Sequence, residues 1–225
     1  LAIGSVLLIT LVAFEELAAT TIMPTVVASF DAAPWYPIAS GAALEAQLSA
    51  TVVAGALADW KGPRAVLFTG MALFAVGLII SAVGPNIITF VVGRALQGLG
   101  GGLLVVPLYV LIGAVAAPDH RPSFFAAFSL SWVLPSLVGP AIAGYVTQVW
   151  GWRYVFGVVP IVVVVAAIPV GYVLRTLPAA EARKAARLAA LSCNAVLAGA
   201  GVMLLQLAGA LTSALSQFGV FLLGA

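Results

Sequence analysis

The sequence predicts an all-α membrane protein, from its composition and from the length of its apolar runs. Of the 225 residues, 64% are hydrophobic and 7% are charged, a balance outside the range of soluble domains. A helix of 20 residues rises about 30 Å and can cross a bilayer. Runs near that length predict crossings at residues 1–29, 37–58, 65–83, 86–116, 122–149, 153–174 and 188–211. A last apolar stretch, 215–225, is too short to cross, so we expect the chain to continue.

The distribution of basic residues predicts the orientation. Seven of the nine Lys and Arg residues fall in loops on one face when seven crossings are counted: Lys61, Arg64, Arg121, Arg175, Arg183, Lys184 and Arg187. Such loops face the cytoplasm. We therefore expect a multi-pass protein of the cell (inner) membrane, with a cytoplasmic N-terminus and a cytoplasmic loop at 175–187. The net charge of +2 reports this topology and gives no reason to expect nucleic acid as a partner.

Aromatic residues mark the opposite ends of the predicted helices. They are Trp35, Tyr36, Trp150, Trp152 and Tyr154. Trp and Tyr are enriched where a membrane meets water. We expect these five side chains to form an interfacial belt.

Four charged residues lie inside predicted crossings: Glu15, Glu16, Glu45 and Arg94. Each would cost roughly 2.5 to 3.5 kcal/mol at a bilayer centre, so we expect a shared polar interior. Glu15 and Glu16 project about 100° apart on a helix, so one can line a cavity while the other packs against a neighbour. A structural salt bridge between Arg94 and one Glu is the alternative, although three acids are present for one base.

The segment 55–64, GALADWKGPR, joins the second and third predicted crossings. Its Gly-Pro pair, flanked by Asp59, Lys61 and Arg64, predicts a tight cytoplasmic turn. The spacing GxLADxxGxR resembles the signature loop between helices 2 and 3 of the major facilitator superfamily of secondary transporters. The resemblance implies a cytoplasmic gate formed by Asp59, Lys61, Gly62 and Arg64.

The first crossing also resembles that family. In FEELAATTIMP, Glu15 stands nine residues before a proline, the spacing of the helix 1 motif in the drug-exporting branches. The resemblance gives Glu15 the place of the membrane-embedded acid and leaves Glu16 without a counterpart.

The fourth crossing contains RALQGLGGG, which resembles the helix 4 motif of the same family. The arginine of that motif is associated with proton coupling, and Arg94 matches it. Gly98 and Gly102 are spaced for the close approach of two helices, so packing explains the glycine part equally well.

The fifth crossing contains PSLVGPAIAG, where Gly139, Pro140 and Gly144 resemble the motif of exporters that exchange drug for proton. Pro140 lacks a backbone donor and Gly139 lacks a side chain, which suits a helix that bends or pivots. An ordinary proline kink at a helix contact is the alternative, so this motif alone does not separate export from import.

An internal repeat predicts how the six crossings are related. Three residues recur at one offset of 89 positions, with Gly55, Gly62 and Arg64 matched by Gly144, Gly151 and Arg153. Two copies of three helices each must have opposite orientations, because the number of helices in a copy is odd. We therefore expect a six-helix bundle of two inverted three-helix repeats.

The chain divides at its one polar stretch. Residues 1–174 are expected to form the N-terminal bundle, 175–187 a cytoplasmic linker, and 188–225 the truncated start of a second half. The lone Cys193 rules out a disulfide within this sequence.

These observations predict a proton-coupled transporter that exports lipophilic or cationic small molecules by antiport with alternating access. Glu15, Glu16, Glu45 and Arg94 are the expected proton-coupling residues. Three further side chains could line the substrate path, namely Gln47, Gln97 and Trp132, although packing is the simpler explanation for the first and last. The expected partners are protons, a small-molecule substrate, the lipid bilayer and the C-terminal half of the same transporter.

Two other functions remain open at this stage. One is a proton symporter that imports a small solute, and the other is a transport-inactive receptor or scaffold with the same fold. The embedded charges argue against a scaffold, which gains nothing from their cost. No HExxH, GxSxG or paired Cys and His spacing occurs, so no enzyme, metal site or cofactor is expected.

Overall fold

The computed structural model describes residues 2–115, 118–176 and 201, and within them every regular element is helical. The six long helices are α1 (Ala2–Ser29), α2 (Tyr36–Lys61), α3 (Pro63–Val83), α4 (Ile87–Val115), α5 (Arg121–Val149) and α6 (Arg153–Thr176), with short 3-10 helices η1 (Ala33–Trp35) and η2 (Pro118–His120). Each long helix is apolar and long enough to cross a membrane. The first six predicted crossings are confirmed, and the predicted crossing 188–211 lies outside the described residues apart from residue 201.

Local sequence explains where the helices begin. Proline occupies the first turn of α2, α3 and α5, where its missing N–H and fixed φ cost nothing. Asn86 caps α4, because its Oδ1 accepts a hydrogen bond of 2.9 Å from the backbone N–H of Thr89. Such a cap satisfies one of the otherwise unpaired donors at a helix start.

Two glycines shape the tight turns between helices. Gly62, between α2 and α3, has φ = 82°, and Gly151, between α5 and α6, has φ = 98°. Only glycine adopts such a φ without strain. The predicted repeat pairs these two residues, and in both copies a glycine with positive φ forms the turn.

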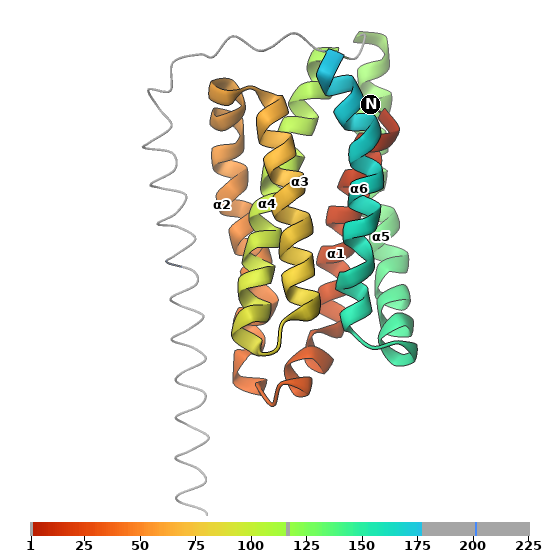
Figure 1. The fold of residues 1–225 in the computed structure, drawn as a ribbon. Helices are drawn as coiled ribbons and strands as arrows, with labels where there is room; N and C mark the ends of the chain where they lie inside the picture. Colours follow the sequence, from red (N-terminus) through yellow and green to blue (C-terminus); the bar gives the residue numbers. More distant parts are fainter. Residues whose placement is uncertain (1, 116–117, 177–200, 202–225) are drawn as a thin grey trace, which may run out of the picture.

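The helices run alternately between two ends of the bundle (Figure 1). One end carries the α2–α3 and α4–α5 turns, with Lys61, Arg64 and Arg121; we call it the basic end. The other carries the α1–α2, α3–α4 and α5–α6 turns, with Phe30 and Trp152; we call it the aromatic end. Helix α1 runs from the basic end and α4 runs toward it, so the two repeats are inverted.

The two repeats exchange their first helices. Helix α4 packs against α2 and α3, and α1 packs against α5 and α6 (Figure 1). Each of these groups of three therefore contains two helices from one repeat and one from the other. The prediction of two inverted three-helix repeats is confirmed.

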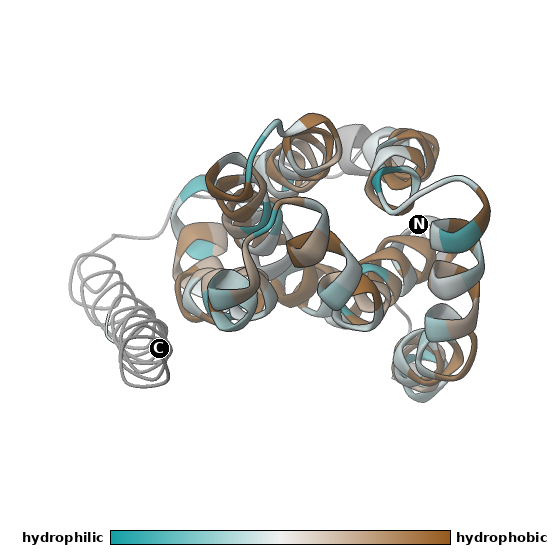
Figure 2. Ribbon diagram, turned by 90° about the horizontal axis from the view of Figure 1, so that it is seen from below, coloured by the Kyte–Doolittle hydropathy of each residue, from teal (hydrophilic) through white to brown (hydrophobic). Residues whose placement is uncertain are grey.

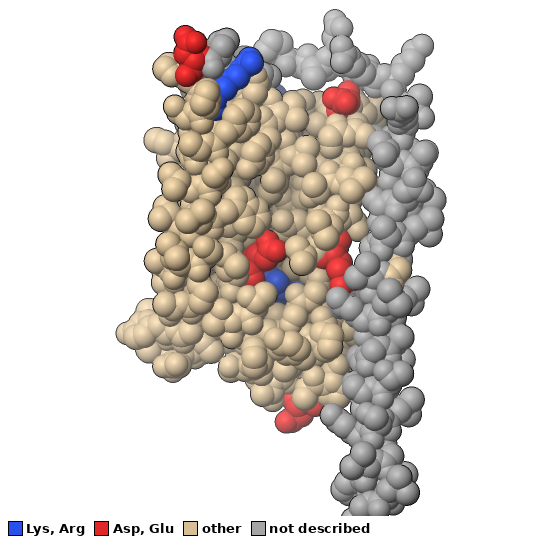
Figure 3. Space-filling view, turned by 180° about the vertical axis from the view of Figure 1, so that it is seen from behind, with Lys and Arg blue, Asp and Glu red and all other residues tan. Residues whose placement is uncertain are grey.

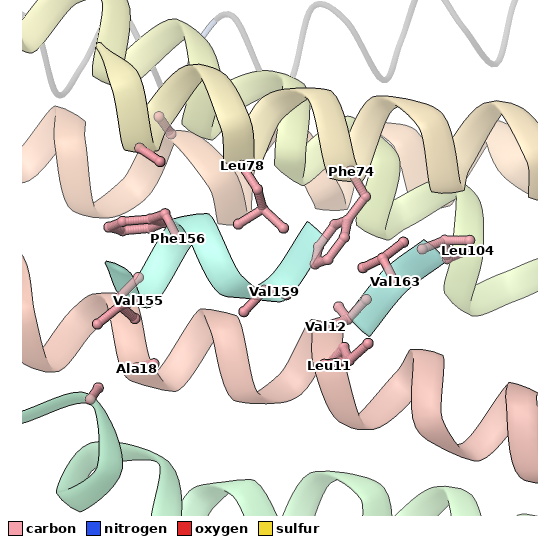
Figure 4. Packing of buried hydrophobic residues seen from close by; sticks show 14 of the residues in the cluster. Leu11, Val12, Ala18, Phe74, Leu78, Leu104, Val155, Phe156, Val159 and Val163 are labelled. Atoms are coloured by element: carbon pink, nitrogen blue, oxygen red, sulfur yellow. The ribbon is translucent and has the colours of Figure 1, made fainter. Parts of the chain in front are cut away.

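The main hydrophobic core lies where α1, α3, α4 and α6 meet. Figure 4 shows its side chains, which include Leu11, Phe74, Leu104, Phe156 and Val163. The outward sides of the helices are also largely hydrophobic, and hydrophilic residues gather in the turns (Figure 2). That distribution suits a bundle surrounded by lipid.

Glycines bring α4 close to two neighbours at once. A Cβ on Gly98 or Gly102 would collide with the backbone of α2, at Ala43 and Gln47 respectively. A Cβ on Gly100 would collide with the backbone of α3 at Phe74. The predicted close helix approach at Gly98 and Gly102 is confirmed.

The predicted interfacial belt is wrong for one of its members. Tyr36, Trp150 and Tyr154 are exposed, but Trp152 is only 5% exposed. It packs edge-on against Phe30, Phe90 and Phe156. The sequence placed Trp152 at a helix end, but the positive φ of Gly151 leads the chain inward and buries the indole in a cluster of rings.

Arg153 completes this end of the bundle. Its Nη2 donates a hydrogen bond of 3.3 Å to the carbonyl oxygen of Gly84, at the end of α3. Its guanidinium carbon lies 4.3 Å from the centroid of the Trp152 ring and 5.6 Å from that of Phe30. Arg153 therefore connects the start of α6 to the ends of α1 and α3.

Candidate functional site

Glu15 occupies the middle of α1 and is completely buried. Neither of its carboxylate oxygens has a hydrogen-bond partner. Its neighbour Glu16 is only partly buried, and one oxygen of Glu16 is likewise buried without a partner. Glu15 is thus the more deeply buried of the two adjacent acids. The expectation that one of them lines a cavity while the other packs against a neighbouring helix stays a prediction.

Arg94 on α4 is the basic member of the cluster and is 1% exposed. Its Nη1 donates a hydrogen bond of 2.6 Å to Oε1 of Gln97, one turn further along α4. Its guanidinium carbon lies 5.7 Å from the centroid of the Phe156 ring on α6, within the range of a cation–π contact.

The positive charge of Arg94 acts on both Glu15 and Glu16 by Coulomb attraction. No hydrogen bond joins Arg94 to Glu15, however, because the Glu15 oxygens accept none. Of the salt bridges that Arg94 could form with one of the three acids, the structure therefore contains no hydrogen-bonded one with Glu15. The arrangement leaves the carboxyl group of Glu15 near a cation and without a fixed partner.

The third acid comes from another helix. Glu45 lies on α2 and is 8% exposed. The close approach of α2 to α4 at Ala43 and Gly98 fixes the position of this part of α2 against α4. Figure 3 shows acidic side chains on either side of a basic one in a hollow about midway between the two ends of the bundle. We call Glu15, Glu16 and Arg94, with the buried Glu45 of the neighbouring helix α2, the charge cluster.

The predicted helix 5 motif reaches the same level of the bundle. Gly139 is buried on α5, and a Cβ there would lie 3.5 Å from the ring of Phe14, the residue before Glu15. Pro140 is partly buried. A Cβ on Gly144 would meet nothing within 4 Å. Of the three motif residues, Gly139 is the one that faces α1 beside the charge cluster.

The three candidates for the substrate path have different surroundings. Gln97 is 3% exposed and is engaged by Arg94. Gln47 on α2 is partly buried, with its Oε1 3.2 Å from the place that a Cβ of Gly101 would occupy. Trp132 on α5 is partly buried and packs against the main core.

The predicted gate residues lie far from the cluster, at the basic end. Asp59, Lys61 and Arg64 are exposed, and Gly62 is buried in the turn. Lys61 Nζ lies 4.9 Å from the centroid of the Trp60 ring. Within the described residues, no ion pair or hydrogen bond joins Asp59 to Arg64.

Some contributors to the site were not predicted as such. The role of Gln97 as the hydrogen-bond acceptor for Arg94 was visible as an i, i+3 spacing on one helix. The contact of Phe156 with Arg94 had no signal, because the two residues lie 62 positions apart on helices whose packing only the fold reveals. The described residues contain no group of three His, Cys, Asp or Glu side chains that could hold a metal ion.

Six membrane-length helices in two inverted repeats, with charges buried at mid-depth, are the architecture of a multi-pass membrane transporter. The family model of the Major Facilitator Superfamily matches residues 5–225. The chain therefore belongs to the Major Facilitator Superfamily, whose members are transporters.

Relatives of known sequence support the same assignment. An uncharacterized transporter of Schizosaccharomyces pombe is 31% identical over 153 residues, which are 68% of this chain and 26% of that protein. The multidrug transporter protein MdtP of Bacillus subtilis is 31% identical over 104 residues, 46% of this chain and 19% of that protein. A multidrug resistance protein B homolog of Mycobacterium tuberculosis is 31% identical over 109 residues, 48% and 20% respectively. The chain thus spans about a fifth to a quarter of the length of these relatives.

Solved structures show the same fold. A D-xylose–proton symporter superposes with a TM-score of 0.64 at 17% identity, covering 80% of this chain and 48% of the other. A mutant of the peptide transporter POT in complex with alafosfalin superposes with a TM-score of 0.71 at 19% identity, covering 98% and 49%. The described bundle has the fold of about half of such a transporter.

Proposed function

We propose that this chain is the N-terminal half of a proton-coupled transporter that exports lipophilic or cationic small molecules by antiport. The observation that carries the proposal is Glu15, a fully buried carboxyl group at mid-membrane without a hydrogen-bond partner. An ionised carboxylate in such a place costs far more than a neutral one unless it is paired. A group of this kind is suited to exchange a proton whenever water or a cationic substrate reaches it.

The neighbours of Glu15 give the exchange its control. Arg94 attracts the ionised form of both Glu15 and Glu16, and Gln97 holds Arg94 in place. When the site opens to one side, water stabilises the ionised acid and a proton leaves. When it closes, burial favours the neutral acid. Substrate and proton then compete for the same charge cluster, which is the basis of antiport.

The basic end faces the cytoplasm in this proposal, since its loops contain the positive residues. The N-terminus and the polar stretch 175–187 are then cytoplasmic, and 188–225 begins the second half. Rocking of the described bundle against that half gives alternating access. Asp59, Lys61, Gly62 and Arg64 form one side of the cytoplasmic gate.

Two observations bear on whether the transporter exports or imports its substrate. The relatives named as multidrug transporters favour export, as does the resemblance of Gly139, Pro140 and Gly144 to the helix 5 motif of drug exporters. Proton symport with import is the second candidate. The two mechanisms differ in the direction of substrate flux in inverted vesicles whose interior is more acidic than the medium. Antiport moves substrate into the vesicles as protons leave, and symport moves substrate out with the protons.

Substitution of Glu15 by Gln tests the proposal. The amide keeps the size of the side chain but cannot exchange a proton, so transport driven by a pH gradient should be lost, by at least tenfold, while substrate still binds. The measurement is substrate flux into liposomes that contain the purified full-length transporter. Asp31→Asn is the matched control: this acid lies just beyond α1, is exposed, and has a φ of 51° that Asn tolerates.

Two results would contradict this assignment. Gradient-driven flux at the normal rate in the Glu15→Gln protein, together with an inactive Glu45→Gln protein, would move the proton site to α2. Flux that is independent of the pH gradient in the unmodified transporter would remove proton coupling altogether.

A further inference from the structure

A cavity separates α1 from α5 at the basic end of the bundle. The two helices touch where Ser131 Oγ donates to the carbonyl oxygen of Val6, at 3.4 Å, and where Phe14 covers Gly139. Toward the basic end the two helices line an open pocket of about 610 Å³. This volume falls in the range of small-molecule sites.

The wall of this α1–α5 cavity is almost entirely apolar. Ile3, Leu7 and Thr10 face it from α1, and Phe124 and Ala127 face it from α5. The Thr10 hydroxyl donates a hydrogen bond of 2.8 Å to the carbonyl oxygen of Val6 on its own helix. Its one donor is thus used within α1, and at this point the cavity offers a polar molecule only the hydroxyl oxygen as an acceptor.

Apart from Thr10, the polar side chains that line the cavity lie at one end. His120 and Ser123 belong to η2 and the first turn of α5, and both are exposed. Asp119 and Arg121 flank His120 with opposite charges. An open apolar pocket with polar, nearly neutral groups at one end complements a molecule that has an apolar tail and a polar head.

We propose that the α1–α5 cavity is a capture subsite for a single-tailed amphiphile, whose tail enters the cavity and whose head stays beside His120 and Ser123. As an entry step for an exported molecule, it rests on the proposed function. The inner wall at Thr10 lies five residues before Glu15, about 7.5 Å along the helix axis. The captured tail therefore ends close to the charge cluster, and the subsite is distinct from it.

The test is a homologous series of alkyltrimethylammonium ions, from butyl to dodecyl, bound to the full-length transporter in nanodiscs without a pH gradient. Partition into empty nanodiscs is subtracted. An alkyl tail that leaves water for an apolar pocket gains about fourfold in affinity per methylene until the pocket is full. We expect that gain in the unmodified protein, with a plateau at the longer chains.

The variant Ala127→Trp fills the cavity from its α5 wall. It should end the gain at a shorter chain and weaken dodecyltrimethylammonium binding at least tenfold. Ala126→Trp is the matched control, because Ala126 precedes Ala127 on α5, is exposed and is not part of the cavity wall. It should bind the whole series as the unmodified protein does.

The outcomes separate the two proposals. Equal binding of the series by Ala127→Trp and Ala126→Trp, or no gain per methylene in the unmodified protein, would overturn the capture subsite. So would native mass spectrometry that finds a phospholipid in the cavity which the alkyl ions do not displace, since the occupant would then be bilayer lipid. If the chain-length dependence and its loss in Ala127→Trp hold while no proton exchange accompanies flux, the amphiphile site stands and the antiport proposal fails.

Discussion

The α2–α3 turn and the α5–α6 turn have a similar backbone conformation, but their side chains make different contacts. Gly62 and Gly151 both have a positive φ, and an arginine follows each by two residues, Arg64 and Arg153. Arg153 is hydrogen-bonded to the end of α3 and lies over the Trp152 ring. Arg64 is exposed, and within the described part of the chain no hydrogen bond connects it to another helix.

The difference between Arg153 and Arg64 indicates which end of the bundle is held together by contacts within this half. At the aromatic end, four rings and Arg153 join α1, α3, α4 and α6 to one another. That end is held within the bundle itself. At the basic end, charged side chains are left exposed beside the turn. We infer that their partners belong to the second half of the transporter, so that rocking of the two halves makes and breaks these contacts at the basic end.

The largest effect is expected where the two turns are alike. Gly62→Ala and Gly151→Ala each place a Cβ on a backbone that L-residues avoid, at a cost of roughly 1 to 3 kcal/mol. Both should lower the apparent Tm of the detergent-solubilised transporter by several degrees. The other glycine pair of the repeat is the control, since a Cβ on Gly55 or Gly144 has room and Ala favours helix.

The comparison of the turns breaks if these four variants behave alike. Should Gly62→Ala be as stable as Gly55→Ala, the strained conformation at the α2–α3 turn would not persist in the working protein. The shared backbone would then be no feature of the repeat.

The next effect is expected where the turns differ. Asp59 lies in the last turn of α2 at the basic end, where its carboxylate can accept hydrogen bonds from Arg64 or from the N-terminus of a facing helix in the second half. A contact of this kind is worth about 0.3 to 2 kcal/mol, and about 1.4 kcal/mol changes a two-state population tenfold. Asp59→Asn should therefore favour the inward-open state and slow turnover by up to about tenfold, with substrate affinity retained.

Cysteine accessibility on the two sides of the bundle, measured with membrane-impermeant maleimide, reports that population shift. Gln148 occupies the repeat position that corresponds to Asp59 and is exposed, so Gln148→Ala should leave accessibility and turnover unchanged. Lost substrate binding in Asp59→Asn with an unaltered labelling pattern would make Asp59 a binding residue and the gate assignment wrong.

Much of the fold could be predicted because the membrane simplifies the problem. A helix in lipid must be apolar and about 20 residues long, so the six crossings and their turns followed from hydropathy, prolines and glycines. The repeat was visible as three residues at one offset. The exchange of first helices between repeats was not, because it depends on which glycine faces approach one another, and Gly98 and Gly100 point to different neighbours.

The candidate site was predicted as a set of residues but without its connections. Glu15, Glu45 and Arg94 could be recognised from the sequence alone, because burying a charge inside a membrane-spanning helix is costly. Which groups they contact depends on helix rotation, and hydropathy does not determine rotation when all sides of a helix are apolar. The same ambiguity explains Trp152, whose place at a helix end was compatible with a membrane interface and with the core.

The smallest expected effect separates the two arginines. Arg153→Ala removes one hydrogen bond to Gly84 and two cation–π contacts near the surface, with Trp152 and Phe30, each worth about 1 kcal/mol or less at an exposed site. It should lower thermal stability by about 1 kcal/mol and leave turnover within twofold of normal. Arg64→Ala should do the reverse, with unchanged stability and slower turnover, because its contacts exist only in the state closed at the basic end. Thermal unfolding and liposome flux should be measured for both variants. An equal loss of thermal stability in the two would mean that contacts within this half also hold the α2–α3 turn. In that case the exposed charges of the basic end would be a topology signal alone, and the cytoplasmic gate would have to be sought elsewhere.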